Sequence, residues 1–588
     1  MKPSLSLLYH KLKEEGFFGK PKDRLLLDEA LEIISERLVS DSPSLTFVQL
    51  PPGYGKTAIP FSLALWAILN DETPIERSIH VLPLRAIVED VNTRFTGYGQ
   101  NGEDRLMGLR AFKVPRDDAE NVSGAQCMFI HGSPFLQKEG FISTTLDTFT
   151  LLACKLPILE ISKIAHSRGY ELYGHYEIAR GAILSSVIIF DEAHLFFEEH
   201  EGSGKASEAL IALMVALLRW RVPIIMMTAT LPSSLRKGIT EWIKEYVPNV
   251  RFSVFEYGHE GKVDRDFEGE IRSVNFRTRF EEDEEEYINL IQQTYSSYDR
   301  VLVVANTIRR AVNLFNKLES KGLKPVLLHS KFIQEDRINK LERLKRSSKW
   351  LCISTQVIEA GVDISSDVLF TDVAPICSIV QRAGRCCRPS HARLEAGEVT
   401  ICISKESIEA AKKIYDESKI EATYEGLTKI DKVFHWHSYL DYFPLISRVY
   451  SRELDLKLGY TFTSMQNIIE EPYYESTDAF ISLLELGGSF TRESLLIPAV
   501  VCKKDEVKDL EDLRNRSGSF IPIEGNELKM ICKKSEVGAL FVKEGGRIEE
   551  RPVSGKIMEN MVAYVINGEI RAFRIPKEVY DEERGLKL

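Results

Sequence analysis

The sequence predicts an α/β protein in which two parallel-sheet domains stand in tandem before a C-terminal domain of mixed α/β character. Three observations support this prediction. Short apolar runs alternate with longer helical segments from about residue 44, a second such series starts near residue 300, and short alternating strands take over beyond about residue 416. Apolar runs between helices are typical of parallel strands covered on both faces.

The expected domains follow from these changes of pattern. We expect an N-terminal helical segment over residues 1–43, a first α/β domain over residues 44–255, a second over residues 256–415 and an accessory domain over residues 416–588. The boundary between the two α/β domains falls in residues 256–270, EYGHEGKVDRDFEGE, because this stretch is polar and contains glycine.

Apolar runs are the expected strands of the two α/β domains. In the first domain they are SLTFVQL, SIHVLPL, SSVIIF and VPIIMM. In the second they are VLVVAN, KPVLLHS, KWLCIST, DVLFTDVA and EVTICIS. Between Thr307 and Gly322, apolar residues recur at helical spacing and a glycine follows, which predicts a helix. Near the C-terminus, Asn567-Gly568 separates two strand-like runs, which predicts a β-hairpin.

Composition excludes several classes of protein. With 44% hydrophobic and 28% charged residues, the chain has the balance of a folded globular protein rather than a disordered one. No apolar run reaches the ~18 residues that a membrane span needs, and no signal peptide is recognisable. The nine cysteines are scattered, as expected for reduced thiols, so we expect a cytoplasmic protein with no membrane partner. The net charge of −11 means that any nucleic acid must bind to a local channel of donors.

A candidate phosphate site follows the first expected strand. The run LPPGYGKT spans residues 50–57 and precedes an apolar helical stretch, the context of a P-loop. Lys56 would reach the β- and γ-phosphates of ATP, and the Thr57 hydroxyl would contact Mg²⁺. Leu50 stands where the general pattern has glycine, so an ordinary glycine-rich turn is the alternative. The expected ATP contacts are Pro52, Gly53, Tyr54, Gly55, Lys56 and Thr57.

Two carboxylate residues that could bind a metal and activate a water stand at the end of a later strand of the same domain. DEAH, residues 191–194, follows the apolar run VIIF, and carboxylates at the C-terminal end of such a strand lie where open α/β sheets bind ligands. Asp191 would hold Mg²⁺, and Glu192 would orient and deprotonate the attacking water. The alternative is a solvated acidic helix start in which His194 only caps or packs.

With both motifs in this order, the chain resembles a superfamily 2 helicase. Further motifs of that family follow in sequence over residues 44–400: LPLRAIVED, STTLDTF, TATLP, LHSKFIQEDR, STQVIEAGVDIS and QRAGRCCR. The resemblance implies two RecA-like domains, ATP and Mg²⁺ as cofactors, and ATP hydrolysis. Iron–sulfur repair helicases are excluded because they need four thiolates near the first motifs.

The resemblance assigns roles to individual residues of this chain. The implied catalytic residues are Glu192, Gln381, Arg385 and Arg388, the two arginines acting as fingers across the interdomain cleft. Two further ATP contacts are Gly361 and Asp363. Residues that couple hydrolysis to strand movement are His194, Thr228, Thr230 and Arg382. Nucleic-acid contacts are Pro83, Arg85, Thr145, His329, Ser330, Thr355 and Gln356.

The subfamily is indicated by LHSKF, TQVIEAGVDIS and VANTIRRA, which are most similar to the CRISPR-associated helicase of type I interference systems. This implies a single-stranded DNA translocase and helicase moving 3′ to 5′, with a Cascade-like surveillance complex and an HD-family nuclease as partners. No histidine is followed directly by aspartate, so we expect the stand-alone form, which cuts no DNA and serves a separate nuclease. Two alternatives are a DEAH-type helicase acting on RNA or repair intermediates, and a nucleotide-gated DNA-binding or recruitment module with little hydrolysis.

Three other groups of residues have more than one interpretation. Cys386 and Cys387 are expected to be buried small residues rather than metal ligands, since no CxxC lies near. His435, His437 and Asp441 form HxHxxxD, which suits a metal or an ordinary loop. Residues 337–349 carry six Lys/Arg, which suits a nucleic-acid backbone or a solvated helix face.

Overall fold

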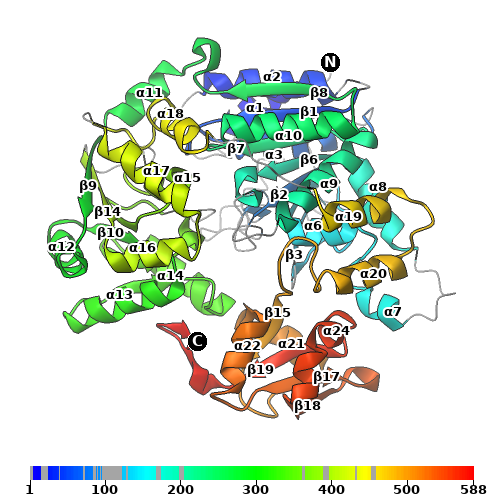
Figure 1. Cartoon of the computed structure of the whole chain (residues 1–588). Coiled ribbons are helices and arrows are strands. Elements are labelled where there is room, and N and C mark those ends of the chain that lie inside the picture. The colour runs from blue at the N-terminus through cyan, green and yellow to red at the C-terminus, as the bar shows by residue number, and fades with distance from the viewer. Residues whose placement is uncertain are drawn as a thin grey trace.

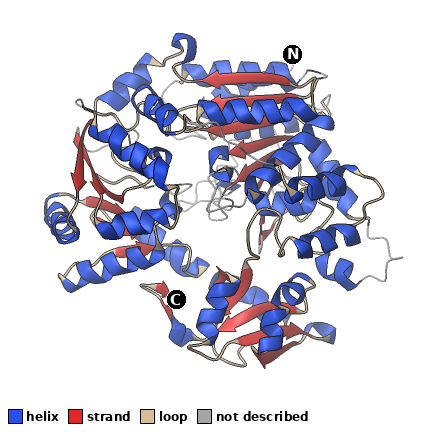
Figure 2. Cartoon of the chain, viewed as in Figure 1, coloured by secondary structure: helices blue, strands red, loops and turns tan. Residues whose placement is uncertain are grey.

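The computed structural model describes residues 4–14, 24–38, 40, 42–70, 73–83, 88, 91–92, 95, 122–127, 130–166, 174–197, 204–359, 364–388, 396–430, 433–451 and 458–587. Two α/β domains lie side by side, and a smaller sheet domain lies beneath them in the view of Figure 1. Figure 2 shows that helices flank the strands in both large domains. The predicted fold class, two RecA-like domains followed by a mixed α/β domain, is confirmed.

The first domain is built on an eight-stranded sheet in the order β4-β3-β5-β2-β6-β7-β1-β8. All its strand pairs are parallel except β3 with β4. Its strands are β1 (Ser44–Gln49), β2 (Arg77–Leu82), β3 (Ser123–Cys127), β4 (Ile130–His131), β5 (Gly140–Thr145), β6 (Ser186–Asp191), β7 (Ile224–Thr228) and β8 (Arg251–Glu256). Its helices include α3 (Ala58–Ile68), α6 (Leu146–Ala153), α7 (Ile161–His166), α8 (Tyr176–Leu184), α9 (Lys205–Arg219) and α10 (Ser233–Tyr246). The N-terminal helices α1 (Leu5–Glu14) and α2 (Leu25–Leu38) pack on this domain.

The second domain has a six-stranded sheet, β11-β12-β10-β13-β14-β9, in which every pair is parallel. Helix α11 (Arg265–Arg272) precedes it. The strands are β9 (Asn275–Glu281), β10 (Arg300–Val304), β11 (Val326–Leu328), β12 (Trp350–Ser354), β13 (Val368–Asp372) and β14 (Ala396–Cys402). The helices are α12 (Glu284–Ser297), α13 (Ile308–Ser320), α14 (Gln334–Arg346), α15 (Ile376–Ala383) and α16 (Lys405–Lys412). Strands β10, β12 and β13 are almost wholly buried, because helices cover both faces of a parallel sheet.

The chain after α16 first forms four helices that pack on the two large domains. These are α17 (Glu417–Thr428), α18 (Tyr439–Val449), α19 (Tyr460–Glu470) and α20 (Ser476–Glu485). Helix α18 packs on α15 of the second domain, while its Tyr442 hydroxyl donates to Ala229 O of the first. Helix α19 packs along α9, where Glu208 accepts the Phe462 N–H. No helix in the described part of the chain is long and apolar enough to cross a membrane.

The C-terminal domain contains a mixed five-stranded sheet in the order β16-β15-β19-β17-β18. Its strands are β15 (Ile497–Val501), β16 (Phe520–Ile523), β17 (Gly538–Val542), β18 (Ile548–Pro552) and β19 (Ile570–Ile575). Its helices are α21 (Leu510–Asn515), α22 (Gly525–Cys532), α23 (Gly555–Glu559) and α24 (Met561–Ile566). Helix α24 contacts α7, so this sheet domain rests on the first domain.

The predicted hairpin at Asn567-Gly568 is wrong. The run before this pair forms helix α24, and only the run after it is a strand, β19. Asn567 caps the helix, and Gly568 has φ 77°, the left-handed conformation in which many helices end. Asn-Gly suits this helix end as well as it suits a type I′ turn, so the pair alone does not distinguish the two.

The chain ends in a short hairpin that docks on the second domain. Strands β20 (Tyr580–Asp581) and β21 (Gly585–Leu586) pair antiparallel. The Tyr580 hydroxyl donates to Asp336 Oδ2 of α14 over 2.6 Å and accepts the Ile333 N–H. The Leu586 N–H donates to Lys331 O over 2.9 Å. The C-terminal domain is therefore attached to both α/β domains.

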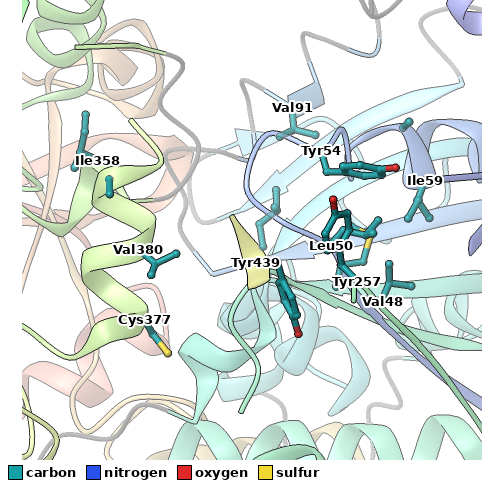
Figure 3. Close-up of a cluster of buried hydrophobic side chains, with 14 of the residues drawn as sticks. Val48, Leu50, Tyr54, Ile59, Val91, Tyr257, Ile358, Cys377, Val380 and Tyr439 are labelled. Atoms are coloured by element: carbon teal, nitrogen blue, oxygen red, sulfur yellow. The ribbon is translucent and has the colours of Figure 1, made fainter. Parts of the chain in front are cut away.

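A buried tyrosine joins the P-loop to the segment between the two large domains. The Tyr54 hydroxyl donates to Asp264 Oδ2 over 2.7 Å and accepts the Leu26 N–H. Asp264 also caps helix α11 by accepting the Phe267 N–H. Figure 3 shows Tyr54 within a buried cluster to which both α/β domains contribute side chains. The conformation of the P-loop is thus tied to the position of α11.

Tyr54→Phe tests this tie. Loss of the hydroxyl leaves the buried Asp264 carboxylate without one of its donors, which costs about 1–3 kcal/mol of the free energy of unfolding. Tyr460→Phe is the matched control, because the Tyr460 hydroxyl also donates to a carboxylate, Glu485, but the Tyr460 residue is 58% exposed. Urea unfolding followed by fluorescence should show a lower midpoint for Tyr54→Phe only. Equal midpoints for the two variants would contradict the assigned role.

Candidate active site

The P-loop connects β1 to α3 at the C-terminal edge of the first sheet. Gly53 and Gly55 have φ of 77° and 100°, values that a residue with a Cβ rarely adopts. Lys56 Nζ bends over the loop and donates to Leu50 O over 3.0 Å. Because the side chain of Tyr54 is buried in the core, only its backbone can contact a phosphate. The open N-terminus of α3 and these glycines suit the binding of an anion.

Asp191 is the last residue of β6 and Glu192 follows it, and β6 lies two strands away from β1 in the same sheet. Burial by itself would raise the pKa of Asp191, but the His80 hydrogen bond and the charge of Lys56 bring that pKa below its ordinary value. Glu192 has a left-handed backbone, φ 46°, which is strained for a residue other than glycine. Burial raises the pKa of Glu192. The two neighbouring carboxyls thus differ: Asp191 favours the ionised form that binds a metal, and Glu192 is the stronger base.

These donors fit a magnesium nucleotide. Mg²⁺ prefers oxygen ligands, usually one or two carboxylates or hydroxyls together with phosphates and water. Asp191 and the half-buried Thr57 offer such oxygens. The charge of Lys56 acts on both Asp191 and Glu192, so the P-loop lies beside the DEAH motif.

A chain of hydrogen bonds crosses from the second domain to Glu192. Gln381 Nε2 donates to His194 Nε2 over 2.9 Å. His194 Nδ1 lies 2.8 Å from the Thr228 hydroxyl, which in turn donates to Glu192 Oε2 over 3.2 Å. Thr230 Oγ1 also contacts His194 Nε2 at 3.2 Å. Burial lowers the pKa of His194 to about 3, so its ring is neutral and its two nitrogens can serve as one donor and one acceptor.

Helix α15 brings QRAGR directly against the first domain. The Cys377 thiol lies 3.5 Å from Thr230 O, and a Cβ on Gly384 would lie 3.4 Å from Pro52 Cβ. Gln381 therefore lies beside TATLP and DEAH, and Gly384 beside the P-loop. The structure brings together five predicted residues: Glu192, His194, Thr228, Thr230 and Gln381.

Arg382 faces the opposite way, into the core of the second domain, where it is fully buried. Its guanidinium donates over 2.8–3.2 Å to five acceptors: Glu359 Oε1, Thr371 Oγ1, Asp372 O, Asn306 Oδ1 and Tyr415 OH. Asn306, at the end of β10, also donates to Val373 O. Arg382 can therefore serve the predicted coupling role only by holding α15 in place.

The two candidate finger arginines lie at the end of α15 and are half-buried. Arg385 donates to Ile358 O and Glu359 O over 3.0 and 2.8 Å, and Arg388 Nε donates to Gly384 O over 3.1 Å. The charge of Arg385 lowers the pKa of Glu192, which burial raises, so this guanidinium acts on the candidate base across the cleft.

The predicted nucleic-acid contacts follow strand ends at the same edge of the two sheets, but most are covered. Thr145 and Thr355 are buried, and Gln356 donates to Asn306 O. His329 Nε2 lies 3.0 Å from Arg584 O of the C-terminal hairpin, and burial lowers its pKa to about 4. Ser330 is exposed and Pro83 half-buried, whereas Arg85 lies outside the described residues, as do the predicted ATP contacts Gly361 and Asp363. The nucleic-acid contacts stay predictions.

The remaining candidate groups have structural partners. Cys386 and Cys387 are buried, as expected, and their thiols lie near Asp367 O. His437 Nε2 contacts Cys386 O at 2.8 Å, and Asp441 accepts the His435 N–H. Among the described residues, no group of three or more His, Cys, Asp or Glu side chains could hold a metal ion.

The sequence motifs do not include two further residues that contact the candidate site. His80 on β2 contacts Asp191, and the signal for it is a histidine between the apolar residues Ile79 and Val81 of a buried strand. Asn306 joins Arg382 to the end of β10, and its signal is a polar residue that follows VLVVA. Neither pattern reveals its partner, since each partner lies on a strand distant in sequence.

The two parallel α/β domains, with a P-loop, DEAH, TATLP and QRAGR at their shared edge, resemble a superfamily 2 helicase. Residues 297–391 match the sequence family described as CRISPR-associated nuclease/helicase Cas3, C-terminal. The chain is 24% identical over 436 residues to the CRISPR-associated nuclease/helicase Cas3 of Streptococcus thermophilus, covering 66% of this chain and 43% of that protein. It is 26% identical over 391 residues to the CRISPR-associated helicase Cas3 of Thermoproteus tenax, and this match covers 65% of this chain and 60% of that protein.

Solved structures show the same fold. The T. fusca Cas3–ADP structure matches with a TM-score of 0.59 at 15% identity, covering 98% of this chain and 69% of that chain. A chain of a CRISPR RNA-guided surveillance complex, pre-nicking, matches with a TM-score of 0.54 at 14% identity, covering 98% and 71%. The predicted resemblance to the CRISPR-associated helicase is confirmed, although the matches span only 43% and 60% of the lengths of the two relatives named above.

Arg382→Met tests the structural role of the buried guanidinium. The substitution removes the ion-pair partner of the buried Glu359, which costs about 3–5 kcal/mol of the free energy of unfolding. Arg346→Met is the control, because Arg346 is paired with Glu342 on the surface and its side chain is 75% exposed. Urea unfolding of both variants should shift the midpoint for Arg382→Met alone. An unchanged midpoint in that variant would remove Arg382 from the role of fixing α15.

Proposed function

We propose that this chain is an ATP-driven motor that moves along single-stranded DNA and unwinds duplex DNA in type I CRISPR interference. The observation that carries this proposal is the hydrogen-bond chain from Gln381 through His194 and Thr228 to Glu192. It joins the candidate water-activating base to a helix of the other domain. A motor needs such a link, because hydrolysis in one domain must change the position of the second.

Each residue of the candidate active site has a role in this proposal. Lys56 neutralises charge on the β- and γ-phosphates, and Thr57 and Asp191 hold Mg²⁺, which would offset the charge that develops on the phosphate oxygens. Glu192, whose pKa is raised by burial, takes the proton of the attacking water. Arg385 and Arg388 would stabilise the charge of the transferring phosphoryl group from the other domain.

DNA contacts would be mostly to the backbone, so we expect little sequence preference. The direction, 3′ to 5′, follows from the family resemblance, as do a Cascade-like surveillance complex and a separate HD-family nuclease as partners. Support for the surveillance complex is the fold shared with a chain of such a complex.

Two other functions make different predictions. A helicase for RNA or repair intermediates would have hydrolysis stimulated by single-stranded RNA or by branched DNA. A nucleotide-gated clamp would bind ATP with little hydrolysis and would not need Glu192. We expect single-stranded DNA to stimulate steady-state ATPase more than RNA of the same sequence, and stimulation by RNA alone would overturn the choice of DNA.

The nucleotide site is tested by two substitutions with different expected defects. Lys56→Ala should lose ATPase and most nucleotide affinity, because it removes the charge facing the phosphates. Glu192→Gln should bind ATP–Mg²⁺ like the parent but hydrolyse it slowly, since Asp191 remains. Binding is measured with a fluorescent nucleotide, and turnover by phosphate release. Near-parental turnover in Glu192→Gln would show that Glu192 is not the base.

The arginines at the end of α15 are tested one at a time. A finger arginine contributes ~10³–10⁵ in kcat in related enzymes, so Arg385→Ala and Arg388→Ala should lose most hydrolysis but keep much of their ATP affinity. Arg551→Ala on β18 is the control, because Arg551 is exposed and far along the chain in the C-terminal domain. ATPase of the double variant within a few-fold of the parent would contradict the assignment of the fingers.

A further inference from the structure

His80 is a histidine within a buried strand of the first domain. The residue lies on β2, is 1% exposed, and pairs in register with Ser143 of β5 and Ile189 of β6. A buried imidazole needs a partner for its N–H, because an unpaired polar group costs free energy away from water. The partner of His80 is the one carboxylate in this sheet that the proposed function assigns to Mg²⁺.

The contact fixes the orientation of that carboxylate. His80 Nε2 lies 3.0 Å from Asp191 Oδ2, while Asp191 Oδ1 accepts the Glu192 N–H over 3.0 Å. Each oxygen therefore has one fixed donor, and a carboxylate has about four lone-pair sites, so further sites remain for a metal or its water. The two donors restrain rotation of the carboxylate about its last bond.

His80 contacts Asp191 from the side of that residue that lies away from the P-loop. In the sheet order β2-β6-β7-β1, Asp191 ends β6, His80 lies on β2, and the P-loop follows β1 on the far side of β7. The histidine therefore does not reach the phosphates, whereas the charge of Lys56 acts on Asp191 from the P-loop side. Any influence of His80 on the nucleotide must pass through Asp191.

The second ring nitrogen of His80, Nδ1, makes no hydrogen bond to a described residue that would compete with the contact of Nε2 to Asp191. His80 Nδ1 has no hydrogen-bond partner in the described part of the chain. The tautomer with its proton on Nε2 suits this environment, because it places the proton at Asp191 and leaves at Nδ1 no N–H without an acceptor. The ring also packs edge-on against Phe141, with centroids 6.1 Å apart, which holds its plane.

We propose that His80 is a positioning residue that holds Asp191 in the orientation in which it binds Mg²⁺ with the nucleotide. This inference rests on the proposed function, since Mg²⁺ is part of it. Residues that orient a metal ligand typically change metal affinity or activity ~10–100-fold when they are removed. His80 acts through Asp191 and touches neither nucleotide nor water-activating base.

The test compares variants that keep or remove the donor at the position of Nε2. His80→Phe keeps the packing against Phe141 but has no donor. His80→Gln places an amide N–H where Nε2 was, and the shorter His80→Asn does not reach Asp191. Mn²⁺ binding to the full chain with a non-hydrolysable ATP analogue is followed by electron paramagnetic resonance, so the readout does not depend on activity.

We expect His80→Phe and His80→Asn to raise the Mn²⁺ dissociation constant ~10–100-fold and His80→Gln to stay within about threefold of the parent. Nucleotide binding in the presence of a chelator should be unchanged in all three. If His80→Phe does not fold, the comparison of Gln with Asn decides. Parental Mn²⁺ affinity in the Phe or Asn variant, or equal losses in Gln and Asn, would overturn the proposal.

Mn²⁺ binding and ATP hydrolysis are measured separately, so failure of the role of His80 can be told apart from failure of the proposed motor. A parent chain that binds Mn²⁺ with the nucleotide analogue but hydrolyses no ATP would refute the motor and leave the role of His80 to be decided by the variants. A parent chain that hydrolyses ATP, with His80→Phe binding Mn²⁺ normally, would refute the role of His80 alone.

Discussion

The geometry of the candidate active site depends on the hydrogen bonds of the buried Arg382 guanidinium. A charge that is removed from water is tolerated only when it is paired and fully hydrogen-bonded, and Arg382 uses five acceptors from four segments of the second domain to meet this condition. This requirement fixes α15 against the ends of β10 and β13. Because α15 cannot rotate without breaking these bonds, Gln381 is presented to His194.

The three residues that link Glu192 to the second domain, Gln381, His194 and Thr228, carry no charge. His194, whose pKa is lowered by burial, connects Gln381 to Thr228 without carrying a charge. Breaking a neutral link of this kind would leave no unpaired ion on either side of the interface. Fixed charges lie on either side of this link, at Lys56 and at Arg385. The arrangement therefore separates the groups that stabilise charge from the groups that connect the domains.

The sequence predicted those features that follow from local patterns. Apolar runs located the strands of both large sheets, and motifs at strand ends located Lys56, Asp191, Glu192 and Gln381 near one edge, because parallel strands present their ends together. Features that depend on partners distant in sequence could not be predicted. His80 contacts Asp191 at the end of the neighbouring strand β6, and Arg382, to which the resemblance gave a coupling role, is buried in the core of the second domain. Asn567-Gly568 was wrongly predicted as a hairpin because a left-handed glycine follows many helix ends and also occurs in type I′ turns.

The double attachment of the C-terminal domain has a consequence for proteolysis. Its chain enters from α20 on the first domain, and its last residues pair with Lys331, Ile333 and Asp336 on the second. A cut in the connection between α20 and β15 would therefore leave a fragment that is still held by the hairpin and by the contact of α24 with α7. While one of the two attachments holds, the other stays at high effective concentration and re-forms readily. The nicked protein would therefore migrate as one particle until it is denatured.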